Sequence, residues 1–130
     1  MQPTVAPRGE ITQIGQIAIN VYDTNRAVAF YRDTLGLKFL FAAGKLAFFD
    51  CGGVRLMLSP PERPEFDHPS SILYFKVADI GLAHASLVQH NVKTEGEPHL
   101  VARMPDHDLW LAEFRDSEGN VMALMSEVRR

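Results

Sequence analysis

The sequence predicts an α+β fold made of two βαβββ units, each a strand and a helix followed by three strands. Three observations support this prediction: hydrophobic spacing switches between the periods of strands and helices, the same order of elements occurs twice, and a proline-rich segment separates the two halves. A chain of 130 residues has the size of one domain. We therefore expect residues 1–130 to form a single domain, with repeats at 11–59 and 70–127 joined by a linker at 60–69.

The first unit opens with a strand at 16–21, where aliphatic residues alternate with small or polar ones. Asp23 or Thr24 can cap the helix that follows, because both side chains accept hydrogen bonds from free backbone N–H groups. Gly36 is placed to end that helix in a left-handed conformation. Three strands then complete the unit, at residues 37–41, 46–51 and 54–59.

The second unit repeats this plan. A strand at 72–77 precedes a helix that Asp79 can cap and Asn91 can end, and His84 on this helix is expected to face solvent. The last two strands are expected at residues 109–115 and 120–125.

The two units differ in length between the helix and the final hairpin. An offset of 56 residues aligns Val21 with Val77, whereas an offset of 66 aligns Phe48 with Phe114, so the second unit is ten residues longer (66 − 56 = 10). The extra residues fall within 95–108. They form either a lid over a binding site or a tolerated surface insertion. The lid candidates are Arg103, His107 and Asp108.

The amino-acid composition limits which classes of protein are expected. The apolar fraction of 46% and charged fraction of 22% are those of a folded globular domain. A net charge of −3 without a basic cluster argues against a nucleic-acid partner, and no apolar stretch predicts membrane insertion. Cys51 is the only cysteine, which favours a reducing, cytoplasmic location.

Two stretches carry a family resemblance: GQIAINVYDTNRAVAFYRDTLGL at 15–37 and LAEFRDSEGNVMALMSEV at 111–128. With the repeat, they make residues 11–128 resemble the vicinal oxygen chelate superfamily. That superfamily includes glyoxalase I, bleomycin-resistance proteins, fosfomycin-resistance enzymes and extradiol ring-cleaving dioxygenases. The resemblance implies that each unit forms a strongly curved mixed sheet and that the two sheets surround a cleft.

The resemblance also implies where a metal would bind. In catalytic members, four inward side chains from the first and last strands of each unit, usually His, Gln or Glu, hold one divalent ion. The corresponding positions here are Gln16, Met57, Ile72 and Ala123. Only the amide of Gln16 offers an oxygen donor, and one neutral amide cannot hold a divalent ion against water. We therefore expect no metal and no cofactor.

The period of two in strands predicts which side chains share the cleft with these four positions. An apolar centre ringed by polar groups suits a small amphipathic or aromatic ligand that carries an anionic group. The alternative is a former metal site filled by core side chains. The expected ligand-binding residues are Gln16, Asn20, Arg55, Met57, Ile72, Tyr74, Lys76 and Ala123. Glu113 is the internal partner expected for Arg55 if no ligand meets it, and no side chain is assigned a catalytic role.

The leading functional hypothesis is a metal-free binding protein resembling the bleomycin-resistance branch, which sequesters a small molecule. One alternative is a lactoylglutathione lyase-like enzyme, or another metal-dependent enzyme of the superfamily. Another is a protein with a filled cleft that acts through self-association. Because related proteins often pair their units across a two-fold axis and open sheet edges need cover, we also expect a homodimer.

Overall fold

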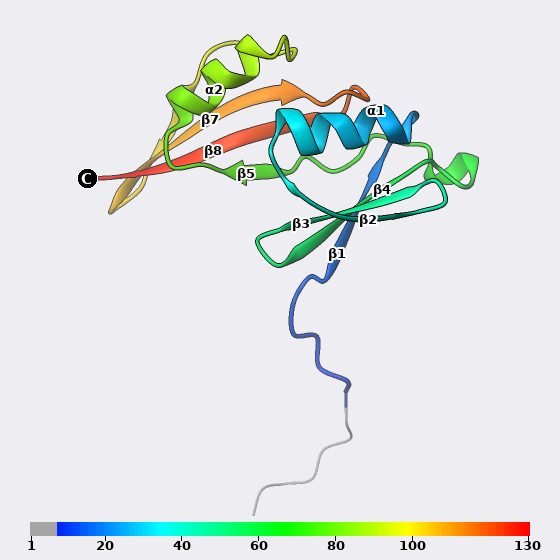
Figure 1. The fold of residues 1–130 in the computed structure, drawn as a ribbon. Helices are drawn as coiled ribbons and strands as arrows, with labels where there is room; N and C mark the ends of the chain where they lie inside the picture. The colour runs from blue at the N-terminus through cyan, green and yellow to red at the C-terminus, as the bar shows by residue number, and fades with distance from the viewer. Residues whose placement is uncertain (1–7) are drawn as a thin grey trace, which may run out of the picture.

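The computed structural model describes residues 8–130 and contains two four-stranded mixed sheets. The strand order is β1-β4-β3-β2 in the first sheet and β5-β8-β7-β6 in the second, and the first and last strands of each unit pair in parallel. The α+β fold of two βαβββ units is thus confirmed (Figure 1). The strands are β1 (Gln16–Asn20), β2 (Lys38–Ala43), β3 (Leu46–Cys51), β4 (Val54–Ser59), β5 (Tyr74–Lys76), β6 (His99–Arg103), β7 (His107–Arg115) and β8 (Val121–Arg129).

Each unit contributes one helix. The first, α1 (Thr24–Ala29), continues as a π-helical turn, η1 (Phe30–Thr34), and the second is α2 (Ile80–Gln89). Figure 1 shows α1 over the first sheet and α2 against β7 and β8. A short 3-10 helix, η2 (Pro64–Phe66), lies in the linker. None of the helices within residues 8–130 is long and apolar enough to cross a membrane.

The helix boundaries follow the local signals. The Asp23 carboxylate accepts a hydrogen bond from the Arg26 N–H at 3.0 Å, and Asp79 caps α2 in the same way. The first helical segment ends at Gly36, whose φ of 75° is costly for residues with a Cβ atom. Asn91 takes the same role after α2, with φ of 59°. These short-range predictions are confirmed.

One face of each sheet packs on the helices and the other lies open. Ile19, Phe49 and Leu58 of the first unit share one continuous core with Phe114 and Met122 of the second. Along β1, Ile17 and Ile19 point into this core and their neighbours point away from it. The side of each sheet opposite its helix is called its open face below.

A polar junction joins the two units at the turn between β7 and β8. The Tyr31 hydroxyl donates to Asp116 Oδ2 at 2.6 Å, although both residues are buried. Arg26 Nε donates to Glu118 Oε2 at 2.8 Å, and no part of the Glu118 side chain is exposed. We call Arg26, Tyr31, Asp116 and Glu118 the inter-unit latch. It ties the first helix to the second sheet without backbone pairing between the sheets.

One expectation about the second unit is wrong, and its extension proves to be partly regular. Within 95–108, residues 107–108 begin β7 and residues 99–103 form β6. Apolar residues such as Leu100, which pairs with Trp110, favour this strand. His84 does not face solvent: it is buried on the inner side of α2, and its Nε2 lies 3.0 Å from the Gly96 carbonyl oxygen.

Candidate functional site

The structure divides the predicted ligand-binding residues between the two open faces. Those on the first sheet are Gln16, Asn20, Arg55 and Met57, and those on or directly before the strands of the second sheet are Ile72, Tyr74, Lys76 and Ala123. The chain brings together the members of each group, but the two groups lie on separate sheets.

Arg55 is the centre of the first group. Its Nε donates to Gln16 Oε1 at 2.7 Å, and its guanidinium carbon lies 5.3 Å from the centroid of the Phe48 ring. The Phe41 ring stacks on Phe48 with a centroid separation of 4.5 Å, and Phe41 is 45% exposed. We call Gln16, Phe41, Phe48, Arg55 and Met57 the Arg55 platform. It presents a fixed cation beside an exposed aromatic surface.

The Arg55 platform does not fit the metal of the catalytic relatives. The oxygen of Gln16 already accepts from Arg55, and its Nε2 lies 3.5 Å from the Met57 sulfur. A divalent ion bound to this oxygen would adjoin a guanidinium, and the two positive charges would repel each other. Elsewhere in residues 8–130, no cluster of three or more His, Cys, Asp or Glu side chains could hold a metal ion.

The expected pairing of Arg55 with Glu113 is not formed. Glu113 lies on the second sheet, where His99 Nε2 is 3.7 Å from its carboxylate, whereas Arg55 contacts Gln16 on the first. The strand patterns could not show this, since Arg55 and Glu113 each interrupt an apolar run in the same way. Arg55 is exposed, so water compensates the rest of its charge.

Asn20 holds the linker. Its Nδ2 donates to the carbonyl oxygens of Phe66 at 2.8 Å and His68 at 2.7 Å, and its backbone N–H donates to Ser70 Oγ at 2.9 Å. The linker therefore folds back along the open face of the first sheet. It encloses a cavity of about 370 Å³ next to Met57. Phe66 and His68 are site residues that the sequence did not reveal, because its prolines predict only a surface segment.

The second group offers less to a ligand, because Lys76 already has a charged partner and Ala123 is buried. Lys76 Nζ lies 2.6 Å from Glu127 Oε1, so its charge already has a partner. Ala123 is fully buried because its register neighbours, Tyr74 and Glu113, are much larger. Of the eight predicted residues, Ala123 is thus the least able to contact a ligand.

The lid candidates lie at the far end of the hairpin of β7 and β8. His107 lies between two carboxylates, 2.7 Å from Asp106 and 3.1 Å from Glu127. Asp108 pairs with Arg130, and Arg103 is the last residue of β6. These contacts tie the three residues into paired strands.

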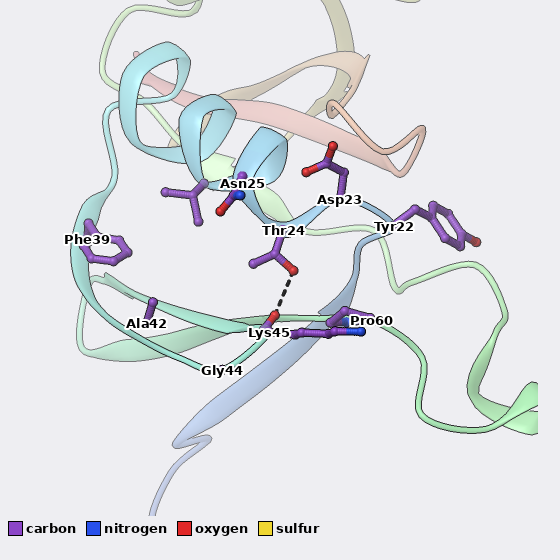
Figure 2. Close-up of a pocket in the computed structure, with 10 residues that line it drawn as sticks. Tyr22, Asp23, Thr24, Asn25, Phe39, Ala42, Gly44, Lys45 and Pro60 are labelled. Atoms are coloured by element: carbon purple, nitrogen blue, oxygen red, sulfur yellow. Dashed lines mark hydrogen bonds between the residues drawn. The ribbon is translucent and has the colours of Figure 1, made fainter.

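A cavity of about 610 Å³ lies between the start of α1 and the turn between β2 and β3 (Figure 2). Thr24 Oγ1 donates to the Lys45 carbonyl oxygen at 2.7 Å across it. Phe39 and Ala42 in its wall pair with core residues of β3, which places it on the helix side of the first sheet. None of the predicted ligand-binding residues lines it, so we do not assign the site there.

Comparisons with known proteins identify three that are similar to this chain. The chain is 29% identical over 126 residues to "Uncharacterized protein YraH" of Bacillus subtilis, covering 84% of this chain and 94% of the relative. The crystal structure of a lactoylglutathione lyase from Agrobacterium tumefaciens has a TM-score of 0.69 at 23% identity, covering 89% of this chain and 94% of that one. The antibiotic-binding protein TnmS3 from Streptomyces sp. CB03234 has a TM-score of 0.72 at 23% identity, covering 90% and 97%.

The likeness to the solved structures concerns the fold. A family model supplies the stronger statement, because it matches residues 13–124, most of the chain. The chain belongs to the Glyoxalase/Bleomycin resistance protein/Dioxygenase superfamily.

Proposed function

We propose that this chain is a metal-free, cytoplasmic small-molecule-binding protein that takes an anionic or aromatic ligand on the Arg55 platform and sequesters it. One observation carries the proposal: the Arg55 guanidinium is held by Gln16 beside the buried ring of Phe48, on which the exposed ring of Phe41 stacks. A guanidinium binds carboxylate and phosphate oxygens through its planar N–H groups. The Phe41 ring offers a surface on which a planar ligand can stack.

The solved structures include one neighbour that favours each of the two leading hypotheses. The neighbour described as an antibiotic-binding protein favours a function in ligand binding without catalysis. The neighbour described as a lactoylglutathione lyase points to an enzyme instead. The donor set argues against that alternative, because Gln16 is committed to Arg55 and the Met57 position offers only a soft thioether sulfur.

Replacing Arg55 with methionine should weaken anionic ligands by about 1.5 kcal/mol or more, roughly tenfold or more, through loss of a charge-assisted hydrogen bond. Neutral analogues should bind nearly unchanged, since methionine preserves much of the apolar contact. Calorimetric titration with small aromatic carboxylates and phosphates measures both effects.

Arg63 provides a matched control. Its guanidinium carbon lies 5.6 Å from the Phe66 ring centroid, so it is also an exposed arginine over a phenylalanine, but it belongs to the linker. Arg63→Met should have a smaller effect on anionic ligands than Arg55→Met. Equal losses in the two variants, or none in either, would contradict the assignment.

Purified and dialysed protein should carry less than about one-tenth of an equivalent of any divalent metal, because the platform lacks the three or more donors that such ions require. Elemental analysis by mass spectrometry measures this. A metal near one equivalent that disappears in Gln16→Ala would refute the metal-free proposal.

The protein should form a homodimer at micromolar concentration. Apolar side chains on or beside the open faces, among them Phe41, Ile72 and Tyr74, are 45–52% exposed, and proteins tend to cover such surfaces and sheet edges. Light scattering coupled to size-exclusion chromatography gives the mass directly. A single species of 14.5 kDa would overturn this prediction.

A further inference from the structure

The junction between the two units is polar at one end and apolar at the other. One end is the inter-unit latch, where charged and polar groups are paired. The other is a recess of about 280 Å³, here called the junction recess. It is lined by Leu35, Leu37 and Cys51 of the first unit and by Phe75, Val77 and Leu124 of the second.

The interior of the junction recess is apolar and uncharged. Its one polar interior side chain is Cys51, where burial and then the nearby Asp50 raise the pKa of the thiol. The thiol is therefore protonated at neutral pH and acts as a weakly polar wall. Water would find few partners there, and a smaller apolar cavity of about 150 Å³ is known to bind benzene. A single ring or a short alkyl chain fits such a space.

The mouth of the junction recess carries a cation. Tyr74 and Lys76 also line the recess; Tyr74 is 52% exposed, and the Lys76 side chain is 66% exposed. Lys76 donates to Glu127, but an ammonium group has three donors. His107 Nε2 also lies 3.1 Å from the Glu127 carboxylate. If a ligand carboxylate bound beside Lys76, Glu127 would therefore keep His107 as a partner.

We propose that the junction recess is a second ligand site, separate from the Arg55 platform, for a small aromatic or short-chain carboxylate. The apolar part lies between the two units and the carboxylate meets Lys76. This assigns to Lys76 a site other than the one that contains Arg55. The proposal does not depend on the Arg55 platform, because the two sites are lined by different residues.

Cys51 gives a site-specific reporter, because it is the only thiol in the chain. Benzoate should slow the reaction of Cys51 with a chromogenic disulfide in a saturable manner, by roughly fivefold or more at saturation, since a bound ring blocks access to the thiol. Benzyl alcohol, a neutral analogue, should protect more weakly. Lys76→Met should lower the apparent benzoate affinity roughly three- to tenfold, the scale of an exposed charge-assisted contact, and leave benzyl alcohol unchanged.

Two further variants separate the sites. Arg55→Met should leave the protection of Cys51 unchanged, whereas Leu37→Trp should abolish it by filling the junction recess. If Leu37→Trp does not fold, crystals of the wild-type protein soaked in 4-bromobenzoate give an independent answer. An anomalous bromine peak between Leu37 and Val77 would support the proposal, and a peak only elsewhere would overturn it.

Other results also overturn the proposal. Protection that never saturates, or equal benzoate affinity in wild type and Lys76→Met, would exclude a carboxylate site here. Loss of protection in Arg55→Met would assign benzoate to the Arg55 platform. Protection that grows with protein concentration in the absence of benzoate would show that a second copy of the chain covers the junction recess.

Discussion

Asp116→Ala should lower the free energy of unfolding by about 3 to 5 kcal/mol, because it leaves several buried donors without an acceptor. The carboxylate accepts from the Tyr31 hydroxyl at 2.6 Å and from Asn120 Nδ2 at 2.9 Å. It also accepts from the backbone N–H groups of Glu118 and Asn120, both at 2.8 Å. One substitution therefore removes three hydrogen bonds within the turn between β7 and β8 and one bond to the first helix.

Urea denaturation followed by circular dichroism measures the loss. Tyr31→Phe removes only one of the four bonds and should cost about 1 to 2 kcal/mol. Asp33→Ala is the matched control: its carboxylate pairs with the adjacent Arg32 on the surface, so the change should cost far less stability than Asp116→Ala. A loss below about 1 kcal/mol in Asp116→Ala would mean that the latch is not important for stability.

Stability should fall in acid because of Glu118. Burial alone raises the pKa of its carboxyl group, but donors from Arg26, the backbone N–H groups of Asp23 and Tyr22, and Ser117 outweigh burial and lower the pKa to about 2. In the unfolded chain the pKa returns to its ordinary value of 4.5. The resulting stabilisation is complete above pH 4.5 and disappears as the pH falls towards 2. The shift corresponds to about 3 kcal/mol, of which about 2 kcal/mol is lost between pH 7 and pH 3.

Urea midpoints at pH 7 and pH 3 test this linkage in wild type and in Glu118→Gln. The glutamine variant keeps the size of the side chain but cannot titrate, so it should be less stable at pH 7 and lose about 2 kcal/mol less on acidification. Glu65→Gln is the control, since Glu65 is exposed and pairs with Arg63 on the surface. Parallel pH profiles for wild type and Glu118→Gln would contradict the prediction.

The features predicted correctly from the sequence depend on neighbours in the chain. Caps such as Asp23 and the left-handed Gly36 are set by a few adjacent residues, and the two-residue period places Ile19 inward and Gln16 outward. The internal repeat then predicted the same order of elements in both units, because Val21 and Val77 occupy equivalent positions before the two helices.

What could not be predicted depends on contacts distant in the sequence. Nothing near Asn20 shows that its amide binds carbonyl groups 46 and 48 residues away. The separation of Arg55 from Glu113 likewise depends on how two sheets pack, which a strand pattern does not encode. Phe48 had a detectable signal: it is the residue opposite Met57 on the neighbouring strand, and an aromatic there could have been assigned to the same face.

Asn20 also bears on how mutational data for this protein should be interpreted. The residue holds the linker through its amide, and its own carbonyl oxygen accepts from Asn120 Nδ2 at 2.8 Å. A library selected for ligand binding would rank Asn20 with the residues that contact the ligand, because its loss releases a wall of the cavity. A parallel selection for folded protein would separate the two classes, since substitutions of an exposed residue of the proposed site such as Phe41 should reduce binding without reducing abundance.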